Sequence, residues 1–312
     1  MTIQPSSLDD LRQFLARTRS EKVSGIDLRD LNRVVAHAPD DMTVTVEAGL
    51  ALDQLQSELA RRRQWLPIDP PNPERLTIGA LLATNASGPR RFGYGTIRDY
   101  LIGIKVVLSD GRVIQSGGRV VKNVAGYDLA KLFIGSHGTL GVIVEATFKL
   151  RPLPEAEQFI QARFESLPDA GRMVDALLAA ELTPVVLDMH APARDCGPST
   201  FFIVLGFAGT REDVEWQRER ARELGLMEPA ALDHEKRFWN GAASARQISV
   251  LPSCLAETVR KLGDVAFVAR AGNGVVYYRG GPPPAKEPLP VKLMQRLKDE
   301  FDPKHILPGL PP

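Results

Sequence analysis

The chain has 312 residues, 44% of them hydrophobic and 25% charged, which is typical of an ordinary folded protein with room for two domains. Its formal net charge is +1, from 39 basic and 38 acidic residues, which gives no electrostatic reason to expect nucleic acid or an anionic membrane as a partner. Two cysteines exclude a disulfide framework, a C-x-x-C metal site and an iron–sulfur cluster of the chain's own.

The N-terminal residues predict a helix and no leader. They contain neither a basic nor an apolar leader segment, and no apolar run in the chain is long enough to span a bilayer, so we expect a cytoplasmic protein without a transmembrane segment. Ser7 followed by Asp10 is typical of a capping box, and Leu8, Leu11 and Leu15 repeat at helical spacing. We therefore predict an amphipathic helix over residues 7–18.

A strand and a second helix follow. Apolar and polar side chains alternate over residues 42–48, which predicts a strand buried on one face only. After Gly49, three leucines at positions 52, 55 and 59 share one helical face. Four prolines in residues 67–73 predict an extended connector.

The stretch from Thr77 to Asp99 is made largely of small, hydroxylated and glycine residues. Such residues let the backbone approach a ligand closely and donate its N–H groups. A similar segment, Gly135–Ile143, follows some way along the chain. The stretch contains no Walker A sequence, and Gly93–Arg98 breaks G-x-G-x-x-G at its last position. We interpret the two segments as walls of one site, with a dinucleotide as the candidate ligand.

Three strands complete the first domain. Residues 102–108 and 112–116 predict strands joined at Asp110-Gly111, a dipeptide that favours a type I′ hairpin turn. Residues 142–150 alternate again and predict a strand that closes the domain, and Pro152 and Pro154 mark its boundary.

The remaining chain predicts helices that alternate with paired strands, which favours an antiparallel α+β layer of the ferredoxin-like kind. A proline-rich linker follows over residues 280–290. The predicted strands are 157–164, 184–189, 200–207, 246–251, 265–269 and 275–279, and the predicted helices are 169–180, 211–224 and 255–262.

Several segments together carry a resemblance to a known family. Residues 83–88 read A-T-N-A-S-G and residues 135–142 read G-S-H-G-T-L-G-V; between them lie Y-G-T-I-R-D at 94–99 and K-N-V-A-G-Y-D at 122–128. The tail contains F-D-P-K-H-I-L-P-G at 301–309. In order and spacing these segments resemble the FAD-binding domain of the vanillyl-alcohol oxidase (PCMH-type) family, and the glycolate oxidase branch in particular.

The resemblance implies an α+β fold: a two-subdomain PCMH-type FAD-binding domain over residues 1–153, a ferredoxin-like α+β cap domain over 154–283, and a linker and short C-terminal return segment over 284–312 that packs back on the FAD domain. FAD is the implied cofactor, with no metal. Small residues at 79, 83, 88 and 95 would allow its close approach, while hydroxyl groups at 77, 87, 136 and 139 and an arginine at 91 or 98 would bind it. The implied cofactor-binding residues are Pro71, Thr77, Ile78, Gly79, Ala83, Asn85, Ser87, Gly88, Arg91, Tyr94, Gly95, Arg98, Asp99, Ser136, Gly138, Thr139, Gly141, Val142 and Ile143.

The family's glycine-rich pyrophosphate loop has no counterpart near residues 23–25, where Val23-Ser24-Gly25 runs straight into Ile26. Two interpretations remain open. Either a solvent loop is shorter here, or the chain binds FAD weakly or not at all.

The sequence identifies no catalytic base. We expect structural roles for His37 and His190, a flavin-side contact for His137, and a place in the tail motif for His305. His234-Glu235 does not begin a zinc motif, because Phe238 occupies the second histidine position of H-E-x-x-H. In catalytic relatives the resemblance places a histidine at the turn that matches residues 269–274, where this chain has Arg270.

The resemblance implies an accessory flavin subunit, the smaller one of its branch. Its partners would be the catalytic flavoprotein subunit and the iron–sulfur subunit of a glycolate oxidase-type complex, through which the chain would reach the inner membrane peripherally. Two alternatives remain: a structural flavin-fold subunit that has lost FAD, and a self-sufficient FAD-dependent 2-hydroxyacid dehydrogenase.

Overall fold

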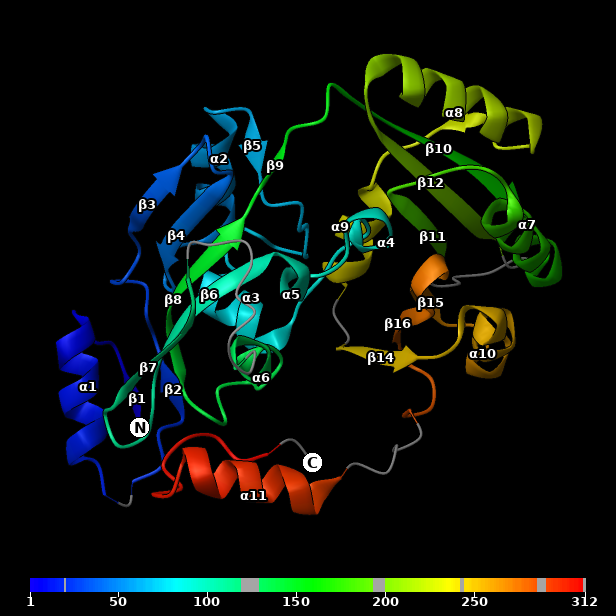
Figure 1. Cartoon of the computed structure of the whole chain (residues 1–312). Coiled ribbons are helices and arrows are strands. Elements are labelled where there is room, and N and C mark those ends of the chain that lie inside the picture. Colours follow the sequence, from blue (N-terminus) through cyan, green and yellow to red (C-terminus); the bar gives the residue numbers. More distant parts are fainter. Residues whose placement is uncertain (20, 119–128, 193–199, 242–243, 285–289, 311–312) are drawn as a thin grey trace. The chain divides into compact units, whose positions relative to one another are not determined.

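A computed structural model describes residues 1–19, 21–118, 129–192, 200–241, 244–284 and 290–310 (Figure 1). The segment 122–128, which contributes to the resemblance, lies outside the described residues. The chain divides into two compact units. Unit 1 comprises Met1–Ser87, Thr96–Leu153 and Pro288–Pro312, and unit 2 comprises Gly88–Gly95 and Pro154–Glu287.

Unit 1 is built on a five-stranded antiparallel sheet with the order β3-β4-β8-β6-β7. Two short pairs accompany it, β1 with β2 in parallel and β5 with β9 antiparallel. The main strands are β3 (Val34–Ala38), β4 (Thr43–Glu47), β6 (Leu101–Val107), β7 (Val113–Gly117) and β8 (Val142–Lys149), and the short ones are β1 (Thr2–Ile3), β2 (Gly25–Ile26), β5 (Gln64–Trp65) and β9 (Arg151–Pro152). The helices are α1 (Leu8–Arg17), α2 (Leu52–Ala60), α3 (Ile78–Thr84), α5 (Ile97–Tyr100), α6 (Ala130–Phe133) and α11 (Val291–Phe301).

The first helix is confirmed. The Oγ of Ser7 accepts a hydrogen bond from the N–H of Asp10 at 3.1 Å, which caps α1. The reciprocal half of the predicted capping box is absent at this cap, because the Asp10 carboxylate accepts from the N–H of Ser6 instead, at 3.0 Å. Leu11 and Leu15 are fully buried, as their spacing predicts.

The prediction that β4 is buried on one face only is wrong, because all five of its residues are buried. Its apolar side chains join the core around α2 and α3, whereas on its other face the Oγ1 of Thr45 lies 3.0 Å from the Oγ1 of Thr147 on β8. A second apolar cluster, on β6 and β8, packs against α1 and the tail residues Ile306 and Leu307. The sheet is therefore covered by parts of the chain that are far away in sequence.

The predicted alternation in β8 is interrupted by a bulge. Lys105 on β6 pairs with Glu145, but the next residue, Val106, pairs with Ile143, so Val144 has no partner opposite it. One extra residue reverses the face to which the later side chains point. Val142 and Val144 accordingly pack with α1 and the tail, while Ala146 and Phe148 belong to the core around α2 and α3.

The hairpin between β6 and β7 is confirmed, but its predicted type I′ turn is wrong. A type I′ turn needs positive φ at both central residues. Here Gly111 has φ +85° and Asp110 does not have a positive φ, and the N–H of Gly111 donates to Leu108 O at 2.9 Å. The turn is therefore longer by one residue and ends at a left-handed glycine.

Unit 2 contains a seven-stranded antiparallel sheet with the order β13-β10-β12-β11-β15-β16-β14, which confirms the predicted antiparallel α+β layer. All the predicted helices and strands of this part are present, within a few residues of their expected ends. The strands are β10 (Ala156–Phe164), β11 (Val186–Ala191), β12 (Phe201–Gly209), β13 (Glu228–Pro229), β14 (Ala245–Ser249), β15 (Ala266–Arg270) and β16 (Val275–Arg279). The helices are α4 (Arg91–Tyr94), α7 (Leu167–Ala179), α8 (Arg211–Glu223), α9 (Asp233–Trp239) and α10 (Leu255–Leu262), with short 3-10 turns η1 (Pro252–Cys254) and η2 (Ala271–Asn273).

The core of unit 2 lies between one face of this sheet and helices α7, α8 and α10. On the other face, α9 packs on β15, while α4 contacts β11 and its Phe92 packs against the core cluster. The described helices include none whose length and hydropathy would allow it to cross a membrane.

Candidate cofactor site

The two small-residue segments meet in unit 1. The N–H of Gly135 donates a hydrogen bond to Leu82 O at 2.9 Å, and the N–H of His137 donates to Ala83 O at 2.9 Å. Leu82 and Ala83 lie in the last turn of α3, so the second segment is joined directly to its C-terminal end. The structure thus brings together two segments that are about 50 residues apart.

A cavity of about 590 Å³ opens where these segments meet. This volume lies within the range of small-molecule sites. Besides the two segments, residues 23–29 and the tail residues Leu307 and Pro308 form its walls. Of the residues that the sequence assigned to cofactor binding, the cavity is lined by Thr77, Gly79, Ala83, Gly138, Gly141, Val142 and Ile143.

The remaining residues that the sequence assigned to cofactor binding do not line the cavity. Ile78 is fully buried in the core of unit 1. The Asp99 carboxylate accepts from the N–H of Thr96 at 2.8 Å and so caps α5, and the Oγ of Ser136 donates to Phe133 O at 2.8 Å. Pro71 is half-buried, Arg98 is exposed, and Ser87 and Thr139 are buried. Gly88, Arg91, Tyr94 and Gly95 belong to unit 2.

The wall at residues 23–29 offers few free backbone donors. The N–H groups of Val23, Ser24 and Asp27 donate to Ile306 O, Met1 O and Ile3 O at 2.7–2.9 Å. The Arg29 guanidinium is bonded to the Asp27 carboxylate, and this hydrogen bond, against a small effect of burial, lowers the pKa of Asp27. A carboxylate that stays ionised does not favour a phosphate beside it.

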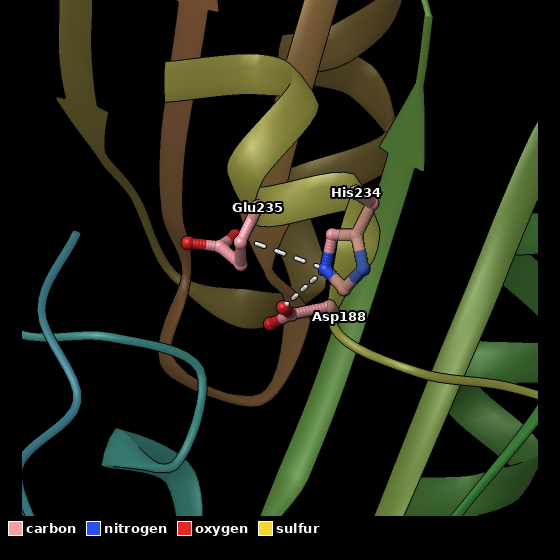
Figure 2. A group of neighbouring side chains, drawn as sticks. All are labelled: Asp188, His234 and Glu235. Carbon is pink, nitrogen blue, oxygen red and sulfur yellow. Dashed lines mark hydrogen bonds and ion pairs between the residues drawn. The ribbon is translucent and has the colours of Figure 1, made fainter. Parts of the chain in front are cut away.

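Unit 2 contains a buried cluster of charged side chains on its β11, α9 and β15 elements (Figure 2). The Nη1 of Arg270 donates to Asp188 Oδ2 at 2.7 Å and to Glu235 Oε1 at 2.7 Å, and its Nη2 donates to Glu235 Oε2 at 2.8 Å. The Nε2 of His234 lies 3.0 Å from Asp188 Oδ2. Asp188 and Arg270 are 0% and 1% exposed, so the cluster is shielded from water.

Asp188, His234 and Glu235 offer ligand atoms within 4.8 Å of one another, a spacing that a metal ion could use. However, the Arg270 guanidinium already lies between both carboxylates. Burial alone would raise the pKa of Asp188, but Arg270 and the hydrogen bond from His234 outweigh it and hold that pKa below its ordinary value. The guanidinium therefore takes the place that a cation would need.

His190 makes the stability of unit 2 depend on pH. Its ring stacks on His234 (centroids 4.5 Å apart) and on Phe202 (5.0 Å), and burial, together with His234, lowers its pKa to about 3. The unfolded chain binds this proton near pH 6.5. The stability that the neutral ring contributes is therefore complete above pH 6.5 and falls as the pH drops toward 3.

We expect the free energy of unfolding to fall by about 2 kcal/mol from this residue between pH 6.5 and pH 5. His190→Phe keeps a stacked ring without the titration and should remove that part of the slope. Urea unfolding at several pH values measures it. His305→Asn, at a site whose side chain is 55% exposed, is the control and should leave the slope as in the wild type.

A comparison with known families decides the nature of unit 1. Residues 5–117 match a family described as "FAD binding domain". They contain the first of the two small-residue segments. Most of the matched residues lie in unit 1, which is therefore similar to an FAD-binding domain.

The curated relatives are oxidases and dehydrogenases. The chain is 37% identical over 161 residues (51% of this chain, 34% of the relative) to "Glycolate oxidase subunit GlcD" of Bacillus subtilis. It is 37% identical over 132 residues (42% and 38%) to "Glycolate oxidase subunit GlcE" of Escherichia coli, and 38% identical over 150 residues (48% and 33%) to "D-lactate dehydrogenase" of Archaeoglobus fulgidus. The chain is thus similar to part of these flavin-family oxidases and dehydrogenases, and it spans only about a third of their length.

Two solved structures of alkyldihydroxyacetonephosphate synthase share the fold of both units. They align over 98% of this chain and 75% or 76% of their own, with TM-scores of 0.70 and 0.74 and sequence identities of 19% and 16%. The α+β fold class predicted from the sequence is confirmed.

The FAD-binding domain has two features that fit a bound cofactor. The Oδ1 of Asn85 is buried and lacks a protein partner among the described residues, in a left-handed residue (φ +51°) that ends α3. Gly138 has φ +73° and no atom within 4 Å of the place where a Cβ would lie, so its surroundings are open toward the cavity that it lines. Gly79, in contrast, is needed for packing, because a Cβ there would lie 3.1 Å from that of Ala48.

We expect Gly138→Ala to reduce FAD retention by the FAD-binding domain. The added methyl group enters the open space beside the cavity, and the left-handed backbone also costs about 1–2 kcal/mol of stability. Flavin absorbance per mole of purified protein measures retention. Gly263→Ala, also at a positive φ (+74°) with open surroundings but in unit 2, is the control for a backbone effect and should cause no loss of flavin. Equal flavin in the two variants would contradict the placement of Gly138.

Proposed function

We propose that the chain is a flavin-bearing electron-transfer subunit of a glycolate (D-2-hydroxyacid) oxidase or dehydrogenase complex. It would be accessory to a catalytic flavoprotein subunit and an iron–sulfur subunit. The names of two relatives, both subunits of glycolate oxidase, support membership of such a complex. FAD, when bound, would accept and pass on electrons, and the protein would supply its binding and placement.

The observation that carries the accessory role is the state of Arg270. The resemblance to catalytic relatives places a histidine at this turn, where a base would be useful. Here the side chain is a guanidinium, bonded to two buried carboxylates and 1% exposed. Such a group cannot accept a proton, since arginine stays charged in proteins.

The first test measures colour and reduction of the purified full chain. The proposal expects flavin absorbance and no bleaching of the flavin when glycolate is added anaerobically to the chain alone. Adding the chain to the complex purified without it should restore electron transfer from glycolate. A colourless, folded chain that still supports the complex would favour the structural alternative, and turnover of glycolate by the chain alone would favour the self-sufficient dehydrogenase.

The wall at residues 23–29 bears on the same alternatives. The N–H groups of Val23, Ser24 and Asp27 are engaged with protein acceptors, and Asp27 adds a negative charge. The cofactor's pyrophosphate would therefore depend on other donors around the cavity, among them Arg75, whose side chain is 88% exposed. Arg75→Gln, with Arg62→Gln as an exposed control outside the cavity, tests this dependence by flavin retention.

A further inference from the structure

Unit 2 has a cavity of its own, which the proposed function does not use. Its volume is about 860 Å³, and every residue that lines it belongs to residues 161–281. It lies on the face of the sheet that carries α9 and includes side chains from β10, β11, β12, β15 and β16. A ligand in this cavity would therefore bind independently of FAD in unit 1.

The walls of the cavity are planar and apolar. Phe202, His190 and His234 form a column of parallel rings, with interplanar angles of 11° and 4°. Phe238 adds further aromatic surface. Because the pKa of His190 is about 3, its ring is neutral at physiological pH and adds no charge to this wall. Such walls favour a planar ligand.

The charged groups around the cavity favour an anion. Arg237 and Arg279 line it, and among the described lining residues Asp264 is the single acidic side chain. The Nε and Nη2 of Arg279 donate to the carbonyls of Phe238 and Trp239 at 2.8 and 3.1 Å, which fixes the guanidinium in place. Its Nη1 has no partner among the described residues. Arginine in such a position is suited to a carboxylate.

One buried polar atom at the cavity lacks a partner. His234 is 4% exposed and lines the cavity, and its Nδ1 makes no hydrogen bond with the described residues. Its Nε2 lies against the ionised Asp188 carboxylate, which can only accept, so Nε2 carries a hydrogen, and in the neutral ring Nδ1 is then an acceptor. Figure 2 shows that Nδ1 faces away from Asp188 and Glu235. An unpartnered buried acceptor calls for a donor from a ligand.

We propose that this cavity binds a planar aromatic carboxylate that carries an N–H or O–H donor. The ring lies against the column of Phe202, His190 and His234. The carboxylate is held by Arg237 and Arg279, and the donor bonds to Nδ1 of His234. No covalent step is involved.

Calorimetric titration of the full chain with indole-3-acetate tests the proposal, because this compound combines a flat ring, a carboxylate and one N–H group. We expect saturable binding that is about tenfold weaker for 1-methylindole-3-acetate, which lacks the N–H, and is lost for tryptamine, which carries a positive charge. The titration is repeated on protein depleted of flavin, where the same affinity is expected. Loss of flavin would count against the proposed function of unit 1 but not against this site.

Two variants locate the site. Arg237→Gln should weaken binding of indole-3-acetate about tenfold, whereas Lys236→Gln, the exposed neighbour on α9 that does not line the cavity, should change it less than twofold. Phe202→Leu, half-buried, removes one ring of the column and provides a second test by lowering affinity without removing charge. The proposal is overturned if indole-3-acetate does not bind saturably, if tryptamine binds equally well, or if Arg237→Gln and Lys236→Gln behave alike.

Discussion

Replacing Arg270 with methionine should lower the free energy of unfolding by about 3–5 kcal/mol, one of the two largest effects that we expect from a single substitution in this chain. The guanidinium is the counter-charge shared by Asp188 and Glu235, which are 0% and 8% exposed. Without it, two carboxylates would lie close together inside the protein with neither a counter-charge nor water. Urea unfolding followed by circular dichroism measures the loss.

Two further variants separate this effect from ordinary loss of an ion pair. Arg220→Met removes a surface pair with Glu223, in which the side chains are 55% and 63% exposed, and should cost less than about 1 kcal/mol. Adding Glu235→Gln to Arg270→Met removes one of the unpaired charges and should recover at least about 1 kcal/mol. If Arg270→Met were no more costly than Arg220→Met, the cluster would not be an electrostatic unit.

The sequence contained enough information to predict most elements of unit 2, because they lie between clear turn signals and have their own periodicity, but the short α4, β13 and α9 were not predicted. It did not reveal the charged cluster, since Asp188, Glu235 and Arg270 come from three separate elements. A signal was present nevertheless. Asp188 interrupts an apolar strand and Arg270 ends one, and a buried charge in such a strand requires a partner.

In unit 1 the alternation of apolar and polar residues gave wrong predictions of burial, because the two ends of the chain pack on the sheet. Alternation in β4 suggested a solvent-facing side, but neither face is open, and part of the cover on the sheet comes from α1 and residues 306–307. The bulge at Val144 depends on pairing with β6, which no pattern within β8 encodes. Periodicity reports one strand at a time, whereas burial depends on what covers the whole sheet.

The candidate cofactor site was predictable only in part, because one of its walls is formed by contacts between distant segments of the chain. Small residues in two segments indicated a ligand surface, and the structure joins these segments by backbone hydrogen bonds. The sequence treated residues 23–25 only as a missing loop, yet residues 23–29 line the cavity with their N–H groups engaged by Met1, Ile3 and Ile306. Contacts between distant segments supply this wall, so sequence spacing gave no sign of it.

Lys298 connects the C-terminal helix to the candidate cofactor site, and Lys298→Met should cost about 3–5 kcal/mol together with most of the bound flavin. Its ammonium group is 4% exposed and donates to Asp302 Oδ2 at 2.5 Å, Thr139 O at 2.8 Å and Pro308 O at 2.9 Å. The same Asp302 carboxylate accepts from the N–H groups of Ile306 and Leu307 at 3.2 and 3.0 Å.

Loss of the ammonium group would leave Asp302 buried and unpaired and would release the carbonyl of Thr139, in the segment that forms one wall of the cavity. Both effects act through the same lysine, so stability and flavin retention should fall together. Lys292→Met, on the exposed side of the same helix, is the matched control and should change neither. Stability lost with flavin fully retained would show that Lys298 holds the tail alone, and that the wall at Thr139 is shaped independently of α11.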